Sequence, residues 1–395
     1  MRKIHAFMLL FLFLTSSCFT VFAKNEKNNE AEIYKISTAD LEVSSRSAIL
    51  MEAESGEIIY SKNENESLSP ASVTKIMTLL LVMEAIDDGR ISLDSKVPIS
   101  AYAASMGGSQ VFLKEGENMT VRELLKCTVI ASANDAAVAL SEYIYGSEAA
   151  FVKAMNDKAR ALEMKNTNFE NTTGLDDTTE NHVTSAKDIA IMSRELIKHS
   201  LIIEYSSLWQ DSIRDGEFIL TNTNRLVRYY DGCTGLKTGS TDKAGYCISA
   251  TAEREGMKLI AVVMGAETRD ERNAIARSLL DYGFSNYALY SEEESVVDNI
   301  DVYGANVKDV PLYSPKLTKL INKNQKSSVE KYYEIPDYCV APLSKGDVVG
   351  KVKYVIDGKL LSEEDLYVKS DAKKLLVFDI FCGMLRNVIS GKFNK

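Results

Sequence analysis

The sequence predicts an α+β fold: an antiparallel sheet flanked by helices, with a helical subdomain, followed by a small β-rich domain. Apolar, β-branched runs typical of strands lie near both ends of the first 285 residues, and helical patterns lie between them. Beyond residue 290 the chain has four of its six prolines and several short β-type runs. A chain of 395 residues is long enough for two such domains.

Composition and charge exclude several functional classes. The chain has 46 Lys+Arg against 56 Asp+Glu, so its net charge of −10 offers no electrostatic footprint for nucleic acid. A hydrophobic fraction of 45% excludes global disorder. With only three histidines in the sequence, a His-rich metal centre is not expected. The six cysteines include no Cys-x-x-Cys pair, so the sequence has neither a zinc ribbon nor a thioredoxin-type redox motif.

Residues 1–23 have the features of a secretory signal. Met-Arg-Lys is followed by an apolar run from Ala6 to Leu14 and by small residues that end at Ala23. We expect cleavage after Ala23, which takes away two bases and no acid and so changes the net charge from −10 to −12. The alternatives are an uncleaved anchor, for which the apolar run is short, and a lipoprotein modified at Cys18, for which the preceding residues are a poor match. The five remaining cysteines show no disulfide pattern and are expected to be free thiols.

The first predicted elements are a hairpin and a long helix. Ser47–Met51 and Ile58–Tyr60 are short apolar runs around a polar turn, which is typical of two paired strands. Ser-Pro at positions 69–70 predicts an N-cap followed by proline at the first helical position. The helix is expected to run to Asp88 and to stop at Gly89. It is apolar almost all round, which predicts a buried central helix.

Caps and apolar patterns predict the other elements of the first domain. Thr120–Glu123 and Ser185–Asp188 both have the sequence of a helix start. We expect helices at 120–131, 135–145 and 185–199. Strands at 244–253 and 258–267 should follow, and then a closing helix at 270–282. The first and last strands are expected to pair in one antiparallel sheet.

Gly283–Tyr290 is the expected boundary between the domain at 24–285 and a β-rich domain at 286–370. Lys351–Ile356 lies before an Asp-Gly turn at 357–358, as in a β-hairpin. Residues 292–395 have as many acidic as basic side chains, so the net negative charge of the mature chain lies in the first domain.

The last residues, 371–395, have the pattern of an amphipathic helix. Five small or polar side chains fall on one face, large apolar residues fill the rest, and lysines lie at both ends. This pattern favours a helix that lies in the surface of an anionic membrane. The alternative is a helix docked on its own domain.

Three short motifs supply residues suited to acyl transfer, and the first is Ser72-Val-Thr-Lys75. At the start of a buried helix, residues i and i+3 share one face. A serine hydroxyl needs a neighbouring base to act as a nucleophile, and a lysine can serve once burial and nearby cations lower its pKa. The same pattern occurs at Ser240, Ser328 and Ser370, so taken alone it also fits a helix that starts with small polar residues.

The second motif, Ser132-Ala-Asn134, lies in the loop between two predicted helices. Loops of this kind often carry function. The alternative is that Ser132 or Asn134 only caps the helix that begins at Asp135.

The third motif, Lys237-Thr238-Gly239, precedes a predicted strand and could lie along the edge of the sheet. Lys237 would supply a positive charge for a substrate carboxylate and Thr238 a hydroxyl donor. Glycine would permit close approach of a substrate to the backbone. The alternative is a strand entry with a solvated lysine.

The three motifs in this order resemble those of the serine-type D-alanyl-D-alanine carboxypeptidases, the low-molecular-mass penicillin-binding proteins. The resemblance covers roughly residues 39–282 and implies a β-lactamase/DD-peptidase-like fold for the first domain. A secretion signal, a C-terminal β domain and a terminal amphipathic helix are also similar to that family's layout. Further segments that look like the family are 60–63, 70–78, 130–137, 164–169, 173–175, 182–188 and 235–241.

The resemblance also implies a mechanism. Ser72 would attack the carbonyl of the penultimate D-Ala of a peptidoglycan stem peptide, with Lys75 as general base and Ser132 as proton relay to the leaving D-Ala. Water would then hydrolyse the acyl-enzyme, whereas β-lactam antibiotics would acylate Ser72 and deacylate slowly. No metal and no organic cofactor are implied. The substrate-binding residues would be Asn134, Lys237, Thr238, Gly239 and Ser240, and the oxyanion hole would be the backbone N–H groups of Ser72 and Ser240.

Several alternatives remain. A β-lactamase would need a glutamate for deacylation, and Glu163 is the nearest candidate, but its surroundings resemble the carboxypeptidases better. Endopeptidase action on peptidoglycan cross-links is a closer alternative. A non-catalytic penicillin-binding sensor is a third. His182 is expected to be a helix-start or packing residue, and Cys233 a neighbour of the site without a catalytic role. The interpretation favoured by the sequence is an extracytoplasmic carboxypeptidase at the outer face of the cytoplasmic membrane.

Overall fold

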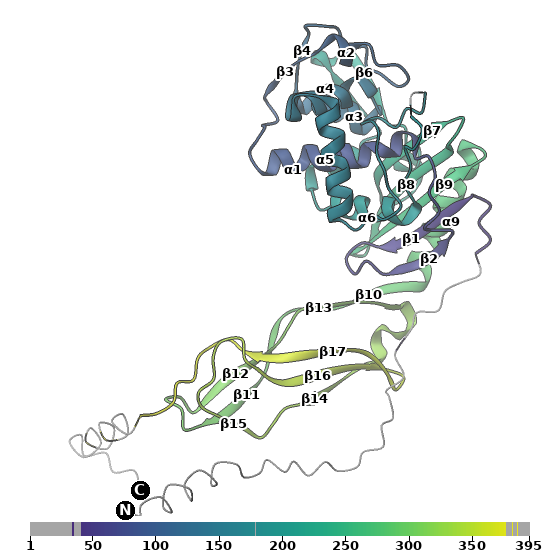
Figure 1. Cartoon of the computed structure of the whole chain (residues 1–395). Helices are drawn as coiled ribbons and strands as arrows, with labels where there is room; N and C mark the ends of the chain where they lie inside the picture. Colours follow the sequence, from purple (N-terminus) through teal and green to yellow (C-terminus); the bar gives the residue numbers. More distant parts are fainter. Residues whose placement is uncertain (1–33, 35–40, 178, 377–380, 382–384, 386–395) are drawn as a thin grey trace, which may run out of the picture.

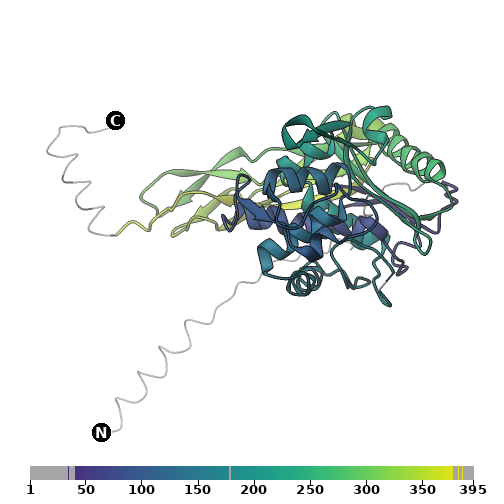
Figure 2. The ribbon, with the colours of Figure 1, turned by 90° about the horizontal axis from the view of Figure 1, so that it is seen from above.

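The computed structural model describes residues 34, 41–177, 179–376, 381 and 385. These residues form an α+β domain with a helical part and, beyond it, an elongated β domain (Figure 1). Figure 2, seen from above, shows the helices gathered in the first domain and the long strands of the second extending away from it. The expected signal sequence, residues 1–23, lies outside the described residues.

A five-stranded antiparallel sheet is the centre of the first domain, with the strand order β2-β1-β9-β8-β7. The first hairpin therefore pairs with strands from the end of the domain, as predicted from the sequence. Strand β7, which contains the Lys-Thr-Gly motif, lies at one edge of this sheet. The strands are β1 Ser47–Glu52, β2 Ile58–Lys62, β7 Cys233–Thr241, β8 Gly245–Arg254 and β9 Met257–Ala266.

Helices cover both faces of this sheet because side chains of each strand alternate between two cores. Ile49 of β1 and Val262 of β9 belong to the larger core, which contains helix α1 (Lys75–Asp87) and helix α6 (Ala186–Leu196). Their neighbours Leu50, Ala261 and Val263 face the other core, against helix α9 (Arg269–Asn286).

The start of helix α1 differs from the prediction. Pro70, rather than Ser69, occupies the N-cap position of a 3₁₀ turn at Ala71–Thr74, and the α-helix begins only at Lys75. Ala71 has a φ of 49°, in the left-handed region that a regular helix start does not use. The rest of the prediction is confirmed, because ten of the thirteen residues of α1 are buried.

The helical part contains the predicted helices and others that the sequence reasoning did not identify. The capping box of Thr120 and Glu123 is present at α3, and α6 ends at Leu196, not at His199. Helix α5 was missed, although Ser147 caps it and basic residues lie in its last turn. The helices are α2 Ala101–Ala104, α3 Val121–Ile130, α4 Asn134–Tyr145, α5 Glu148–Ala161, α7 Ser200–Ser206 and α8 Leu226–Tyr229. Two small two-stranded sheets lie among them, β3 Lys96–Pro98 with β4 Asn118–Thr120, and β5 Gln210–Ile213 with β6 Phe218–Thr221.

The second domain is β-rich, as predicted. It has a six-stranded sheet in the order β14-β16-β17-β12-β11-β15, and a separate pair of β10 with β13. The Asp357-Gly358 turn joins β16 to β17, and both residues have positive φ, as a tight hairpin requires. The strands are β10 Tyr287–Glu292, β11 Ser295–Tyr303, β12 Asp309–Ser314, β13 Leu317–Asn322, β14 Val329–Glu334, β15 Tyr338–Val340, β16 Val348–Ile356 and β17 Lys359–Val368.

The chain leaves the β domain in extended form. Ala372 pairs with Leu343 and Lys374 with Ala305, so a helix does not begin at residue 371 as the sequence pattern predicted. These backbone groups are used by the β domain instead. Most of the expected helix, residues 377–380, 382–384 and 386–395, lies outside the described residues. The described part of the chain contains no helix long and apolar enough to cross a membrane.

Candidate active site

The three motifs meet at one cleft. Ser72 lies in the 3₁₀ turn before α1, Ser132 in the loop between α3 and α4, and Lys237 on the edge strand β7. Lys75, Asn134 and Lys237 lie beneath the cleft and are almost completely buried. The cleft has a volume of about 180 Å³ and is lined by Ser72, Ser109, Ser132, Thr223, Thr238, Gly239, Ser240, Arg269 and Arg272.

The contacts of Lys75 can all be made by a neutral amine. Its Nζ lies 2.5 Å from Oδ1 of Asn134 and 2.9 Å from the carbonyl oxygen of Thr173, both of which only accept hydrogen bonds. Its third contact is Oγ of Ser72, at 3.0 Å. A neutral –NH₂ group has two N–H donors for the two acceptors and one lone pair that the Ser72 hydroxyl can donate to. This arrangement is suited to removing the proton from Ser72.

The electrostatic surroundings favour this neutral form. Burial holds the pKa of Lys75 well below its usual value, and the charge of Lys237 lowers it further, whereas the Asp135 carboxylate acts in the opposite direction. Lys75 is completely buried, so the cost of removing its charge from water is high. The site therefore places a lysine base next to the Ser72 hydroxyl.

Ser132 is held on the opposite side by the second lysine. Lys237 Nζ donates to Oγ of Ser132 at 2.8 Å and to the carbonyl oxygen of Thr238 at 2.9 Å. Burial, followed by the nearby charge of Arg272, lowers the pKa of Lys237 to about 7. Ser132 has a φ of 61°, a conformation that serine rarely adopts and that aims its hydroxyl into the cleft.

Asn134 has no role as a helix cap. The N-cap of α4 is Ala133, without a side-chain hydrogen bond. The Asn134 side chain instead connects Lys75 to the carbonyl oxygen of Gly107, to which its Nδ2 donates at 2.7 Å. The structural alternative for the Ser-x-Asn motif is therefore wrong for this residue.

Gly239 allows strand β7 to lie directly against the turn that contains Ser72. A Cβ atom at this position would lie 2.7 Å from the backbone nitrogen of Ser72 and 2.9 Å from that of Val73. Any side chain would therefore displace the strand or the turn. The hydroxyl groups of the neighbouring Thr238 and of Thr223 are hydrogen-bonded to each other, with their oxygens 2.8 Å apart.

We expect Gly239→Ala to lower kcat/KM by at least about 100-fold, the effect of losing one oxyanion-hole donor, because the methyl group would displace the Ser72 N–H. The measurement is the second-order rate constant of acylation by a fluorescent penicillin. Gly107→Ala is the control, since a Cβ there would meet nothing within 4 Å. Acylation of Gly239→Ala at the wild-type rate would contradict this close packing.

A second close contact with glycine supports the Ser72 turn from the other side. A Cβ on Gly174 would lie 1.8 Å from the carbonyl oxygen of Ala71, and Gly174 has a φ of 82°. The preceding residue, Thr173, supplies the carbonyl that Lys75 contacts. The Thr-Gly-Leu segment at 173–175 is therefore part of the support for the base.

His182 has the expected packing position, whereas Cys233 packs against the core on the α9 side of the sheet and does not line the cleft. His182 Nδ1 accepts from the backbone N–H of Glu170, so its Nε2 carries the proton and donates to Thr74 Oγ1 at 2.8 Å. Burial lowers the pKa of His182 to about 4, and it does not contact Ser72. Burial raises the pKa of the Cys233 thiol to about 11, so it is not an activated nucleophile.

Glu163, the candidate for a β-lactamase-type glutamate, is exposed beyond the end of α5 and does not line the cleft. Sequence reasoning missed Arg272, which is 3% exposed in the first turn of α9 and reaches the cleft. It also missed Thr223 and Ser109, which line the same cleft. None of these three residues belongs to a recurrent motif, so their position is evident only from the fold.

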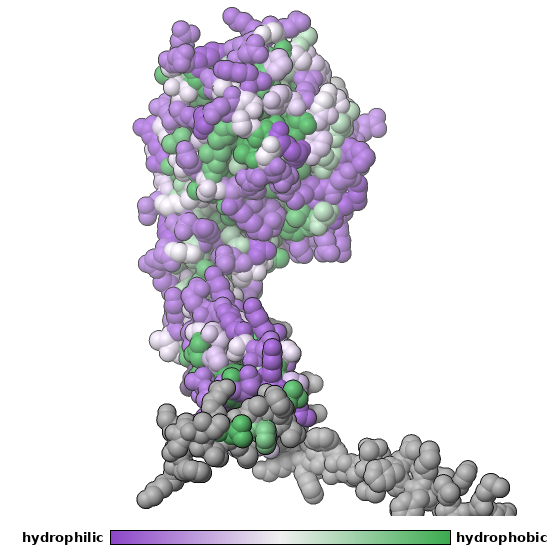
Figure 3. Space-filling view, turned by 90° about the vertical axis from the view of Figure 1, so that its left-hand side faces the viewer, coloured by the Kyte–Doolittle hydropathy of each residue, from purple (hydrophilic) through white to green (hydrophobic). Residues whose placement is uncertain are grey.

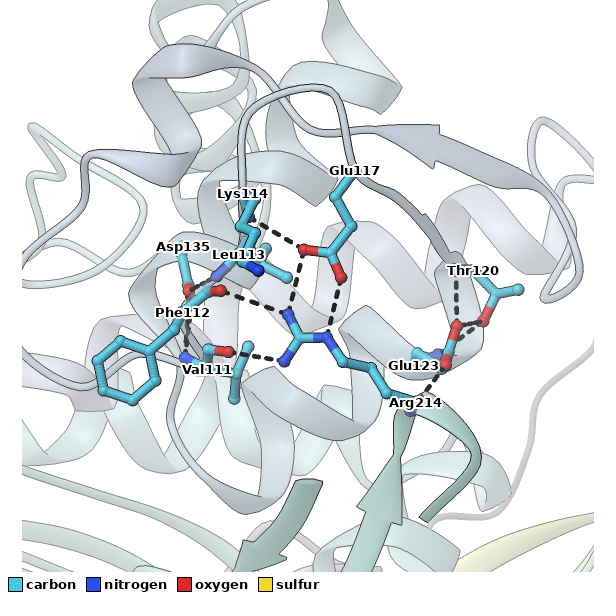
Figure 4. A network of polar contacts seen from close by, with 9 residues as sticks. All are labelled: Val111, Phe112, Leu113, Lys114, Glu117, Thr120, Glu123, Asp135 and Arg214. Atoms are coloured by element: carbon cyan, nitrogen blue, oxygen red, sulfur yellow. Dashed lines mark hydrogen bonds and ion pairs between the residues drawn. The ribbon is translucent and has the colours of Figure 1, made fainter. Parts of the chain in front are cut away.

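A polar network fixes the loop that forms one wall of the site (Figure 4). Arg214, from the turn between β5 and β6, makes a two-point ion pair with Glu117 at 2.9 and 3.1 Å. The same guanidinium donates to the carbonyl oxygens of Val111 and Phe112 at 3.0 and 3.4 Å. Arg214 therefore holds the outer side of the loop at 107–117.

Asp135 holds the inner side of the same loop. Its buried carboxylate accepts from the backbone N–H groups of Val111 and Leu113 (Figure 4). The loop in turn contacts Asn134 twice, through the carbonyl oxygens of Gly107 and Ser109. The network thus orients the side chain that holds Lys75.

We expect Arg214→Ala to slow acylation by penicillin about tenfold, because a small displacement of Asn134 disturbs the geometry around Lys75. The measurement is the acylation rate constant together with the melting temperature. Arg122→Ala is the control, since it removes an exposed ion pair with Asp94 that has no contact with the loop. An unchanged acylation rate in Arg214→Ala would contradict a positioning role.

Comparisons with known proteins agree with this geometry. Residues 34–268 match the family described as D-alanyl-D-alanine carboxypeptidase, and residues 284–374 match the family described as the C-terminal domain of penicillin-binding protein 5. The chain is 42% identical over 382 residues to the D-alanyl-D-alanine carboxypeptidase DacF of Bacillus subtilis, with 95% of each chain covered. It is 32% identical to the D-alanyl-D-alanine carboxypeptidase DacA of Haemophilus influenzae, with 92% of this chain and 94% of that one covered.

Solved structures give the same result. Penicillin-binding protein 5 of Haemophilus influenzae has a TM-score of 0.77 at 32% identity, over 86% of this chain and all of that one. Penicillin-binding protein D2 of Listeria monocytogenes, in its ampicillin-bound form, has a TM-score of 0.58 at 34% identity, over 62% of this chain and all of that one.

Proposed function

The chain belongs to the D-alanyl-D-alanine carboxypeptidase family, and we propose that it removes the terminal D-alanine from peptidoglycan stem pentapeptides through an acyl-enzyme on Ser72. The observation that carries the proposal is the set of contacts around Lys75. Two acceptors take the N–H groups of a neutral Lys75, the form that burial favours, and its lone pair is then free for the Ser72 hydroxyl at 3.0 Å.

In the acylation step, Ser72 Oγ attacks the carbonyl of the penultimate D-Ala and Lys75 takes its proton. The backbone N–H groups of Ser72 and Ser240 stabilise the oxyanion. Ser132, which accepts a hydrogen bond from Lys237, passes a proton to the amine of the leaving D-Ala. Water then hydrolyses the ester and regenerates the Ser72 hydroxyl.

The substrate's terminal carboxylate is bound by Lys237, Thr238 and Arg272. Thr238 and Arg272 line the cleft directly, and Lys237 supplies positive charge from below. Arg272 is buried, and burial lowers its pKa only to about 10, so it stays charged at neutral pH. A β-lactam has a carboxylate in a comparable position, and its acyl-enzyme on Ser72 is expected to hydrolyse slowly.

We also propose that the protein is attached to the outer face of the cytoplasmic membrane through residues 377–395. The chain enters this segment from the free end of the β domain, where Leu375, Leu376, Phe381 and Leu385 are exposed next to two lysines. Figure 3 shows hydrophobic residues (green) at this end of the molecule, at the bottom of the view. Loss of binding to anionic vesicles on truncation after residue 376 would support this attachment, and retained binding would overturn it.

The experiment that tests the activity is release of free D-alanine from a peptide ending in D-Ala-D-Ala, with the full chain in detergent. Release at a rate that depends on enzyme concentration and is blocked by penicillin is the expected result. A folded protein that binds penicillin covalently and releases no D-alanine would overturn the proposal in favour of a penicillin-binding sensor.

A further inference from the structure

One of the two acceptors that hold Lys75 belongs to a buried segment without regular secondary structure. The carbonyl oxygen of Thr173 lies 2.9 Å from the Lys75 Nζ, in a stretch, residues 171–176, that is neither helix nor strand. Thr172, Thr173 and Gly174 are buried in this stretch. Backbone groups of such a segment have no partners from a helix or a sheet, so other groups must hold them. The position of the Thr173 carbonyl therefore depends on the side chains that bind its neighbours.

Asn171 binds the same peptide group that contacts Lys75. Its Oδ1 accepts from the backbone N–H groups of Thr173 and Gly174 at 3.2 and 2.7 Å, and its Nδ2 donates to the carbonyl oxygen of Leu175 at 2.7 Å. The carbonyl of Thr173 and the N–H of Gly174 belong to one planar trans peptide and point in opposite directions. Asn171 therefore holds one side of this plane while Lys75 contacts the other.

Glu148 holds the preceding peptide group from the first turn of helix α5. Its Oε1 accepts from the backbone N–H of Thr172 at 2.9 Å and from the Thr172 hydroxyl at 2.7 Å. Its Oε2 accepts from the hydroxyl of Tyr102 at 2.6 Å. On the other side of Thr172, the carbonyl oxygen accepts from the hydroxyl of Thr78 at 2.7 Å. Both backbone groups of Thr172 are thus bound, which limits the movement of Thr173.

Neither of these two side chains belongs to the reacting centre. Within the described part of the chain, neither Glu148 nor Asn171 is a hydrogen-bond partner of Lys75, and neither lines the active-site cleft. The charge of Glu148 is not among the causes that shift the pKa of Lys75. An effect of either residue on the reaction must therefore pass through the backbone of residues 172–174.

We propose that Asn171 and Glu148 are positioning residues for the general base, and that they act by fixing the carbonyl oxygen of Thr173. The inference rests on the proposed acylation of Ser72. A neutral amine with both N–H groups held directs its lone pair to one place, which here is the Ser72 hydroxyl. If the Thr173 carbonyl is released, the amine of Lys75 can rotate about its Cε–Nζ bond and the lone pair loses this direction.

Release of this carbonyl affects Lys75 with a sign opposite to that of a general loosening of the site. A carbonyl oxygen 2.9 Å from Nζ favours the charged amine, so its loss lowers the pKa of Lys75. Entry of water would raise the same pKa, because burial is the main cause that holds it down. The acidic limb of the pH–rate profile of acylation therefore moves to lower pH in the first case and to higher pH in the second.

The test measures acylation by a fluorescent penicillin as a function of pH, with the full chain in detergent and two pairs of variants. Asn171→Leu and Glu148→Leu remove the acceptor oxygens, whereas Asn171→Asp and Glu148→Gln keep them. In both leucine variants we expect the plateau rate to fall about tenfold, as for a small displacement of a catalytic group. Their acidic limb should move to lower pH by about half a unit.

The conservative variants should restore the plateau rate. Glu148→Gln keeps an oxygen for Thr172 and should have the limb of the wild type, since the charge of Glu148 is not needed. Asn171→Asp keeps the oxygen that accepts from Gly174 and adds a negative charge, so its limb should move to higher pH.

Asn156→Leu is the matched control. Asn156 binds the backbone N–H and carbonyl of Phe169 at 2.9 and 2.8 Å, just before the same segment. Its loss should lower the melting temperature and leave the acidic limb in place. A limb that moves to higher pH in the leucine variants, or equally far in Asn156→Leu and Asn171→Leu, would overturn the inference in favour of a general loosening.

The remaining outcomes separate this inference from the proposed function. Leucine variants with the plateau rate and limb of the wild type would show that the Thr173 carbonyl is held without Asn171 and Glu148, and the carboxypeptidase proposal would stand. If penicillin does not acylate the folded wild type at any pH, the proposed acyl-enzyme itself is wrong and the inference fails with it.

Discussion

Replacing Ser72 with alanine is expected to abolish covalent labelling by penicillin and to lower D-alanine release by at least about 10⁴-fold, as in other enzymes that lose their serine nucleophile. Within the described part of the chain, Ser72 is the only hydrogen-bond partner of Lys75 that can donate a proton to it, because Asn134 Oδ1 and the Thr173 carbonyl only accept. Alanine leaves the turn and the lysine in place, so the fold should remain. The measurement is the mass of the intact protein after incubation with penicillin.

The chain contains a matched control for this variant. Ser328 begins another Ser-x-x-Lys sequence, but it lies at the end of a 3₁₀ turn in the β domain. Ser328→Ala should be labelled by penicillin as the wild type is. A mass increase in Ser72→Ala, with a melting temperature equal to that of the wild type, would show that another residue is the nucleophile.

Local chemistry predicts those features of the site that depend on residues close together in the sequence. Ser72 and Lys75 are three residues apart at a helix start, so their contact follows from helical geometry. The antiparallel sheet followed from two sets of β-branched runs. In contrast, the N-cap expected at Ser69 was wrong because Gly174 and Gly239 pack against the turn and stabilise a left-handed Ala71. Tertiary packing here overrides the local capping signal.

Other residues of the site could not have been predicted from spacing. Arg272 reaches the cleft from helix α9, and Thr223 from the segment after β6, at sequence distances that no short motif spans. The same holds for the pairing of Arg214 with Glu117, which brings together residues 97 positions apart. Helix α5 is a different case, because the signals at Ser147 and in its last turn were present in the sequence.

The pH dependence of acylation is expected to be set on its acidic side by Lys75. This lysine can take the proton of Ser72 only when it is neutral, so activity is lost as the pH falls through its pKa in the folded protein. Burial lowers that pKa most, the charge of Lys237 lowers it further, and the charge of Asp135 raises it. The acidic limb of the pH–rate profile should therefore move in a predictable direction when either charged neighbour is removed.

Two variants should move this limb in opposite directions, each by about one pH unit, the size of effect that a nearby charge produces. Lys237→Met removes a positive neighbour, so the pKa of Lys75 rises and the limb moves to higher pH. Asp135→Asn removes a negative neighbour, so the pKa falls and the limb moves to lower pH. The acylation rates of each variant are normalised to that variant's own maximum. The position of the limb is therefore independent of the weaker binding expected in Lys237→Met.

Lys243→Met provides the matched control, because Lys243 is a cation near the site that has no place among the causes of the Lys75 shift. Its acidic limb should coincide with that of the wild type. Shifts of the same sign in Lys237→Met and Asp135→Asn would indicate a general loosening of the site, and no shift in either would mean that Lys75 is not the base. Opposite shifts require that the titrating base interacts electrostatically with both Lys237 and Asp135. Lys75 is such a group, and it lies within hydrogen-bonding distance of the Ser72 hydroxyl.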